Sequence, residues 1–468
     1  MTAAKTSAPL YVVAAFLWMA SPAAGQLPRP GATSTVTACE GKQTMVAVGQ
    51  ALAVNLVINR ADAWLFDWDW ARVNFESWSR NLELGWQWDE TQFGINMFVH
   101  PYHGSLYVDA ARANCLSYWE AIPVAFLGSW TWEFFGEKWR PSLNDFWMTG
   151  FGGVAMGEML HRVSRAIIDE EATGGERITR ELAALAVNPV GGLNRLVRGQ
   201  WTGRGVNPVD RLPESYMFRA KAGGRTVRED GSPAGPTTSP TLLLDVAYGD
   251  IFETESEAPF DVINVLAQVS PDGGGLNILR AVGRLYGKDL SDRDSWQRHQ
   301  VVISQRFDYV NNPVYHFGEQ SLEVGLQSLW RVGPSGFRLR TRLAGDVVLL
   351  GAIDALDAGL GQRAIDYGPG LGVIAELALE RAGTTYVSLY NRVRYLRSVS
   401  GAPANHNILF SGLDVTIPVT SQLGIGAYMS GDRRRSYYED FPKDERSYLE
   451  TRIYLSWTFA RETAGSPR

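Results

Sequence analysis

Between about residue 205 and residue 459 the sequence alternates apolar and polar side chains, and this alternation limits the fold more than any other feature. In 337–343 the apolar side chains would share one face of an extended chain, and Arg338, Arg340 and Arg342 would fill the other. A period of two is typical of a β-strand, and a face that carries arginine needs water or ionic partners. We therefore predict strands with one apolar face and one wet face.

About twelve segments show this pattern. An even number of antiparallel strands with an apolar and a polar face is the construction of an outer-membrane barrel, and closure removes the exposed edges that so many strands would leave. The predicted fold class is α+β, with an N-terminal helical module followed by an antiparallel transmembrane β-barrel of about 12 strands. Six side chains are predicted to face the lumen, where they would meet water, carboxylates of the module or lipopolysaccharide phosphates: Arg338, Arg340, Arg342, Glu376, Arg392 and Arg394.

The last of these segments carries a signal of its own. Between Glu450 and Phe459, apolar or aromatic residues alternate with polar ones. This stretch resembles the terminal strand by which barrel-assembly machinery recognises outer-membrane proteins, although Tyr454 stands where Gly is common. We expect that machinery as a partner during biogenesis, and outer-membrane lipid or lipopolysaccharide around the barrel. A soluble lipocalin-like strand is the alternative. The barrel would span 205–459, with a tail at 460–468.

The first 25 residues have the three parts of a secretory signal peptide. Lys5 is the only charge in the first 20 residues, 10–20 is apolar, and the small residues of 23–25 follow. Because the apolar run is too short to span a bilayer, we interpret 1–25 as a signal peptide, with an N-terminal anchor helix as the alternative. The expected location is the outer membrane of a Gram-negative bacterium. Only two cysteines are present, Cys39 and Cys115, and we expect both to be free.

Residues 26–204 form the expected helical, aromatic-rich module, which could plug the lumen or cap its periplasmic mouth. Eleven of the 16 tryptophans lie between Trp64 and Trp147. The stretch 45–59 predicts a short buried helix, and no helix appears apolar over the roughly 20 residues that a membrane span requires. Connections such as 431–446 are interpreted as polar loops of the barrel.

A longer helix is predicted from Ser142 to about Asp169. Ser142 and Asp145 form an S-x-x-D capping box after a proline. Gly150, Gly153 and Gly157 then lie near one face, and glycine lets another backbone approach closely. We expect this face to pack against the helix that contains 129–135.

Most residues that could carry chemistry lie in the module. His100, His103 and Glu120 are the acid–base candidates for an enzyme that acts on envelope lipid. A wider set of polar residues must find partners inside the apolar helices: Asp89, Tyr107, Arg112, Glu133, Glu137, Asn144, Asp145, Glu158 and Arg162.

A metal site is the weaker reading of the same region. Glu158 and His161 have the i, i+3 spacing of di-iron bundles, but those bundles need a second such pair, which the sequence lacks. We therefore expect no metal and no cofactor. A net charge of −6 without a concentrated basic face also argues against nucleic acid as a partner.

Several separated motifs resemble the bacterial domain-of-unknown-function 3943 family. They are HPYHGSLYVDAARA, SWTWEFFGE, RPSLNDFWMTGFGG and GEMLHR, and the resemblance covers about 71–197. It implies an outer-membrane or periplasmic setting and no established activity. Cys115 stands where this family is expected to have glycine, which speaks further against a disulfide. The expected function is a non-enzymatic barrel in transport or envelope maintenance, with a helical plug; the enzyme is the alternative.

Overall fold

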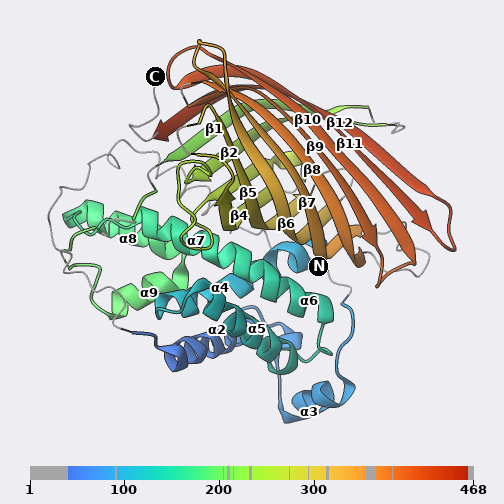
Figure 1. The fold of residues 1–468 in the computed structure, drawn as a ribbon. Helices are drawn as coiled ribbons and strands as arrows, with labels where there is room; N and C mark the ends of the chain where they lie inside the picture. The colour runs from blue at the N-terminus through green and yellow to red at the C-terminus, as the bar shows by residue number, and fades with distance from the viewer. Residues whose placement is uncertain are drawn as a thin grey trace. The chain divides into compact units, whose positions relative to one another are not determined.

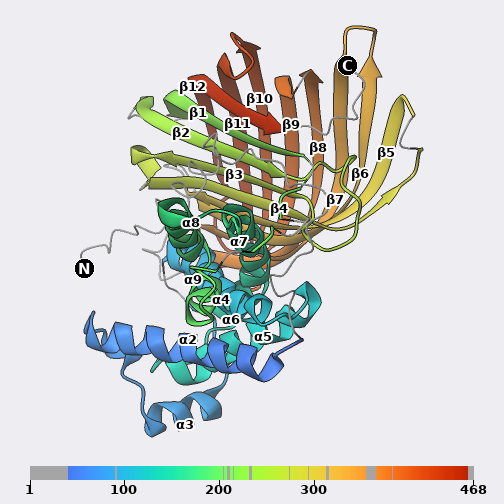
Figure 2. The same ribbon diagram turned by 90° about the vertical axis from the view of Figure 1, so that its left-hand side faces the viewer.

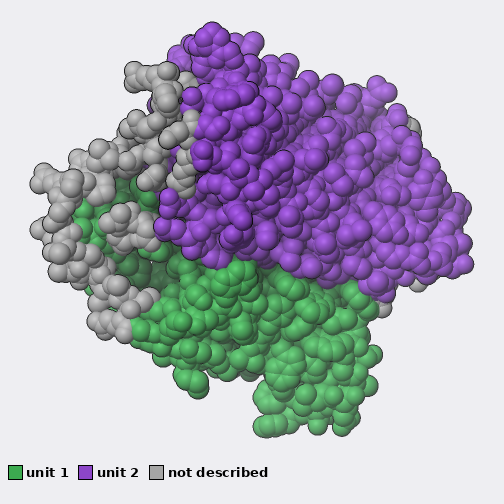
Figure 3. Space-filling model, in the orientation of Figure 1, with its two compact units in different colours: residues 1–212 green, residues 213–468 purple. Residues whose placement is uncertain are grey.

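The computed structural model describes residues 41–461 except 90–91, 204, 208–210, 214, 231–234, 274, 293–294, 312–315, 355–364 and 382. The predicted signal peptide, Cys39 and most of the predicted tail lie outside these residues. The chain divides into two compact units, 1–212 and 213–468, coloured separately in Figure 3. The first unit is helical and the second is a closed β-barrel, so the predicted α+β class is confirmed.

The helical unit (Figure 1) is built from α-helices joined by short 3-10 and π-helical segments. Side-chain caps define several helix starts: Asn74 caps α3, Ser117 caps α5 and Asn188 caps α9. The elements are α2 (Thr44–Trp64), η2 (Asp69–Ala71), α3 (Phe75–Leu84), η3 (Ile95–Val99), α4 (His100–Ala113), α5 (Tyr118–Thr131), η4 (Trp132–Gly136), α6 (Leu143–Trp147), η5 (Met148–Gly152), α7 (Gly153–Ile167), α8 (Gly174–Val187) and α9 (Pro189–Val197).

Helix α2 corrects two predictions. The stretch 45–59 was expected to be a short buried helix, but α2 has 21 residues and exposes most of its large apolar side chains, such as Met45, Leu56 and Val57. Among the described residues, α2 is also long and apolar enough to cross a membrane by length and composition. The prediction failed because apolar composition alone does not say which face of a helix meets the rest of the protein.

The prediction that both cysteines are free is wrong for Cys115, the one cysteine among the described residues. Cys115 is disulfide-bonded. It has a φ of 71°, a left-handed conformation that favours glycine, which agrees with the expected glycine at this position. Counting cysteines could not decide this point, because a single bridge leaves no spacing pattern in the sequence.

The predicted helix from Ser142 is present as α6, η5 and α7 in succession, and the Ser142 hydroxyl accepts a hydrogen bond from the Asp145 amide at 3.4 Å. Its glycines do allow close packing, but their main partner is α4. A Cβ on Gly153 would lie 2.5 Å from the backbone of Gly104, and one on Gly157 would lie 2.6 Å from Val108. Gly150 packs on Phe126 of α5. The expected contact with 129–135 is therefore replaced by α4.

We predict that Gly153→Leu destabilises the helical unit by about 3 kcal/mol, because a larger side chain has no room beside the Gly104 backbone. Limited proteolysis of the full chain should then cleave the helical unit at lower denaturant, while circular dichroism retains the β-strand signal. Gly175→Leu is the control, since nothing lies within 4 Å of a Cβ at that position. Equal protease resistance of both variants would contradict the close α4–α7 contact.

The barrel has twelve antiparallel strands in sequence order, and β1 pairs with β12 to close it (Figure 2). The strands are β1 (Tyr216–Glu229), β2 (Thr237–Tyr248), β3 (Ile263–Ser270), β4 (Gly275–Asp289), β5 (Gln297–Asn311), β6 (His316–Val332), β7 (Phe337–Asp354), β8 (Ile365–Arg381), β9 (Thr384–Arg397), β10 (Ala404–Pro418), β11 (Leu423–Tyr438) and β12 (Asp444–Arg461), with η6 (Pro271–Gly273) between β3 and β4.

The barrel has two distinct ends. At the terminal end, Tyr216 of β1 pairs with Arg461 of β12 and with Tyr248 of β2. The opposite end holds the connection between β11 and β12. The stretch 431–446 was expected to be a loop, but β11 continues to Tyr438 and β12 begins at Asp444. Most of its polar residues belong to strands. Their polarity reflects the environment of their side chains and does not show where strand pairing ends.

The outer face of the barrel is apolar on many strands. Ile453 and Leu455 of β12 are 73% and 64% exposed, and large aliphatic side chains are exposed on β6, β7, β8 and β11 as well. Tyr454 points inward, where its hydroxyl bonds Thr416 at 2.8 Å and Asp414 at 2.5 Å. A closed antiparallel barrel with an apolar exterior and a charged interior is the construction of Gram-negative outer-membrane barrels.

Candidate functional site

The helical unit contains a group of carboxylic acids and histidines, four of them buried and Asp89 and Glu137 half-buried, which we call the acid–histidine cluster: Asp89, His100, His103, Glu133, Glu137 and Asp145. His100 Nδ1 lies 3.2 Å from the Thr149 hydroxyl, and its Nε2 lies 3.7 Å from Asp145 Oδ2. His103 Nε2 lies 3.0 Å from the Tyr107 hydroxyl. Both rings therefore have polar side-chain partners inside the unit.

The carboxyls of the cluster are held by neighbouring donors. The Ser142 amide donates to Glu133 Oε2 at 2.8 Å, and the Trp132 indole donates to Glu137 Oε1 at 2.7 Å. Asn144 links two chain segments, because its amide group donates to Asp145 Oδ1 at 2.9 Å and its carbonyl accepts from the Asp89 backbone at 2.7 Å.

Three π-helical segments place these side chains. Segment η3 leads directly into His100, η4 contains Glu133, and η5 contains Thr149, the partner of His100. A π-helical turn adds a residue to the helix, which rotates the following side chains, and such turns are frequent at functional sites. Because helix periodicity assumes a regular turn, sequence patterns could not bring these residues onto one site.

Burial sets the protonation states of the cluster. It raises the pKa of Asp145 to about 8, and a nearby Asp89 carboxylate adds to this shift. Burial also raises the pKa of Glu137 to about 7 and that of Glu133 well above its usual range. It lowers the pKa of His103 to about 3, with His100 adding to the effect. The arrangement therefore stores protons on carboxyls beside neutral imidazoles.

Glu120 does not belong to this cluster, although it was predicted beside the histidines. Its carboxylate accepts from the Ser117 backbone at 2.9 Å and pairs with Lys42 at 2.6 Å. Twelve residues separate Glu120 from Trp132, the residue against which His103 packs, which is about 18 Å along a helix. Its role is to cap α5, so the expected acid–base group of three is not assembled.

The remaining predicted polar residues form a second group. Glu158 is fully buried and pairs with Arg112 at 2.8 Å and with Arg162 at 3.1 Å. His161, the other metal candidate, has a pKa well below its usual range because of burial and the nearby Arg112 and Arg165. Three arginines around this pair disfavour a cation, and no group of three metal-ligating side chains occurs among the described residues.

Inside the barrel, charged side chains form a crossing layer: Asp308, Glu319, Asp346, Arg392 and Arg394. Arg392 of β9 reaches Asp308 of β5 at 3.2 Å. Arg394 of β9 pairs with Glu319 of β6 at 2.9 Å and with Asp346 of β7 at 2.8 Å. These strands are not hydrogen-bonded neighbours of β9, so the pairs join side chains within the barrel interior.

Toward the opposite end, the interior becomes apolar. Phe317 and Phe410 meet with ring centroids 5.4 Å apart. They belong to an interior apolar cluster contributed by seven strands: Val227, Val310, Phe317, Val348, Ile353, Leu396, Ile408, Phe410 and Tyr448. The strands' own side chains thus fill this part of the lumen.

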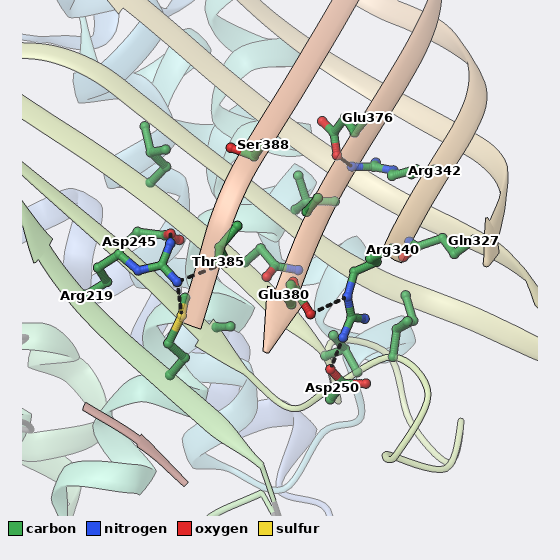
Figure 4. Close-up of a pocket in the computed structure, with 18 of the residues that line it drawn as sticks. Arg219, Asp245, Asp250, Gln327, Arg340, Arg342, Glu376, Glu380, Thr385 and Ser388 are labelled. Carbon is green, nitrogen blue, oxygen red and sulfur yellow. Dashed lines mark hydrogen bonds and ion pairs between the residues drawn. The ribbon is translucent and has the colours of Figure 1, made fainter. Parts of the chain in front are cut away.

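Toward the terminal end lies a cavity of about 440 Å³ (Figure 4). Arg340 bonds Asp250 at 2.7 Å and Glu380 at 3.4 Å. Asp250 belongs to 249–262, the connection between β2 and β3, which Arg284 holds by pairing with Asp261 at 2.8 Å. The cavity wall also carries Arg219, Asp245, Arg342, Glu376, Thr385 and Ser388.

The predicted lumen-facing residues divide between these two regions. Arg338, Arg340, Arg342 and Glu376 line the cavity, Arg394 lies in the crossing layer, and Arg392 belongs to both. Sequence reasoning missed their acidic partners Asp308, Glu319 and Glu323. The alternation could have identified two of them. Glu319 and Glu323 are an even number of residues apart and so lie on the same face of a strand, whereas the apolar residues at 322 and 324 lie on the other face.

Comparisons with known proteins find a family of undefined function within the helical unit and identify no activity. The family described as "Domain of unknown function (DUF3943)" matches residues 85–190, which confirms the resemblance. No curated protein matches the chain. The KdgM porin is 8% identical with a TM-score of 0.23, over 52% of this chain and 99% of that chain. The Pseudomonas putida toluene transporter TodX is 8% identical with a TM-score of 0.21, over 54% and 91%. OmpT of Vibrio cholerae, in its trimer form, is 9% identical with a TM-score of 0.20, over 52% and 99%. We draw no functional argument from likenesses of this size.

The raised carboxyl pKa values predict a pH dependence of the helical unit. The folded state keeps a proton on Asp145 up to about pH 8, whereas the unfolded chain releases it near its ordinary pKa of 3.8. The folded state binds more protons in this window, so the free energy of unfolding should fall as pH rises through it. Asp145→Asn should make that fall shallower in chemical unfolding followed by hydrogen exchange. Glu171→Gln, at an exposed carboxylate, is the control. An unchanged pH slope in Asp145→Asn would contradict the prediction.

Proposed function

We propose that this protein is a non-enzymatic outer-membrane barrel of the transport or envelope-maintenance class, closed in the state described, which binds a small polar solute at its terminal end. The crossing layer carries the proposal, because its ion pairs join strands that are not neighbours and so occupy the interior of the barrel with side chains. The volume of the cavity is consistent with a bound ligand, because its 440 Å³ lies within the range of roughly 300–1,000 Å³ of small-molecule sites.

The chemistry of the cavity wall favours a solute with several hydrogen-bonding groups. Guanidinium groups alternate with carboxylates, and the hydroxyls of Thr341, Thr385 and Ser388 lie among them. Arg340 and Arg342 are each shared between two carboxylates, so a ligand could replace one partner without leaving the arginine unpaired. A helical plug of the lumen stays a prediction. Within the barrel, side chains of the strands themselves occupy part of the lumen.

Closure predicts that the wild-type protein in planar lipid bilayers shows no steady ionic conductance. Arg392→Ala with Arg394→Ala removes the cationic half of the crossing layer and should produce measurable conductance. The matched control is Arg433→Ala with Arg435→Ala. It removes two exposed arginines, both of which pair with Glu445. Steady conductance of the wild type would overturn the closed barrel, whatever the variants do.

The cavity predicts a difference in the reactivity of two introduced cysteines. Ser388→Cys lines the cavity, whereas Ser430→Cys lies on a buried part of the inner wall. A small charged methanethiosulfonate reagent should modify the first much faster than the second, as measured by mass spectrometry of the folded protein. Equal rates would show that the cavity does not admit polar solutes.

A further inference from the structure

Helix α2 has its polarity reversed relative to a helix of a water-soluble protein. The side chains that it buries are small or polar: Ala47, Ala51, Asn55, Asn59, Asp62 and Ala63. Its large apolar side chains point outward, with Met45 83% exposed, Leu56 62% and Val57 67%. In soluble proteins such aliphatic side chains are the ones most often buried.

The buried polar side chains hold α2 against the rest of the unit. Asn55 donates to the Gly128 carbonyl at 2.9 Å and accepts from the Tyr107 hydroxyl. Asn59 donates to the carbonyls of Ala71 at 2.8 Å and Gly136 at 2.7 Å. Small residues with inter-helix polar contacts inside, and large apolar residues outside, are how helices pack in lipid.

An aromatic group continues the exposed side from the last residue of α2, Trp64, into the segment that follows. Trp64, Phe66 and Trp68 are 73%, 58% and 40% exposed, and the rings of Phe66 and Trp68 stack with centroids 5.1 Å apart. The Arg60 guanidinium lies 5.4 Å from the Trp64 ring. Tryptophan beside arginine is typical of the boundary between lipid headgroups and acyl chains. Within the helical unit, α2 and α3 form an outer layer in both views (Figures 1 and 2).

Three ion pairs lie around this face. Lys138 pairs with Asp69 at 2.9 Å, Arg72 pairs with Asp67, and Lys42 pairs with Glu120 at 2.6 Å. The face therefore matches a surface without a strong net charge, and an acidic or basic protein partner would gain little from it. The exposed apolar side extends along the whole of α2, about 30 Å for its 21 residues.

We propose that this membrane face, formed by Met45, Leu52, Leu56, Val57, Trp64, Phe66 and Trp68, lies in the headgroup–acyl boundary of a phospholipid bilayer with α2 parallel to the surface. Interfacial helices bury one apolar side to a depth of about 5–10 Å. The opposite side of α2 is attached to α4, α5 and η4, so the helix cannot cross the bilayer alone. Because the same chain forms a membrane barrel, a lipid surface is always within reach of this unit.

The test uses the full chain reconstituted in phosphatidylcholine vesicles. Leu56→Cys is labelled with the polarity-sensitive fluorophore NBD without reductant, so that the bonded Cys115 does not react. Lipids with a doxyl quencher near the headgroup or deep in the acyl chain report the position of the probe. We expect blue-shifted emission and quenching that is stronger for the shallow doxyl group. The same label at Glu171→Cys, an exposed polar position of the same unit, should stay unquenched.

A second variant distinguishes contact of this face with lipid from contact with protein. Leu52→Glu with Val57→Glu should release the Leu56→Cys probe from quenching while the protease resistance of the unit is retained. A blue-shifted probe that no doxyl lipid quenches would mean that protein covers the face, either a second copy or residues 1–40, and would overturn the proposal. A probe with water-like emission in vesicles would overturn it as well.

Discussion

The antiparallel pairing of β1 with β12 is the contact on which the rest of the barrel depends. It runs from Tyr216 opposite Arg461 to Glu229 opposite Tyr448 and leaves no open edge. In a bilayer each unpaired backbone group costs several kcal/mol, so a sheet can exist there only if it closes on itself. Closure also separates the two faces of every strand, because residues of one parity then meet lipid and those of the other meet each other.

The enclosed face explains the ion pairs. Arg306 and Arg394 are at most 1% exposed, and a buried charge of this kind is tolerated only when carboxylates neutralise it. In this barrel of twelve strands an arginine can reach a carboxylate several strands away, as Arg392 of β9 does to Asp308 of β5. The same contacts that compensate the charges also place side chains inside the lumen.

The helical unit follows a different physical plan. Gly104 and Gly153 bring α4 and α7 within backbone contact, which leaves α2 outside this pair with polar residues facing inward. The acid–histidine cluster lies where π-helical segments adjoin the start of α4, the end of α5 and the start of α7. Burial raises the pKa of the Glu133, Glu137 and Asp145 carboxyls, which makes the unit sensitive to pH.

Much of the fold was readable from local patterns. The twelve alternating segments, the terminal strand at 450–459 and the cap at Ser142 depend on residues close in sequence, and each is present. The parity of Arg394 was likewise sufficient to place it inside. The candidate site was less predictable: Glu120 was predicted as an acid–base residue and Glu133 as a buried polar residue, yet Glu120 caps α5 and Glu133 is the one that lies with the histidines.

The sequence by itself therefore determined the class of the protein, because strand period and helix capping act over a few residues. Only the tertiary structure decided which charges meet across the lumen, which helix receives the glycine face of α7, and which side of α2 is turned outward. Those outcomes depend on residues separated by tens of positions, such as Asn55 with Gly128 and Asp308 with Arg392, and no local pattern records a distance through space.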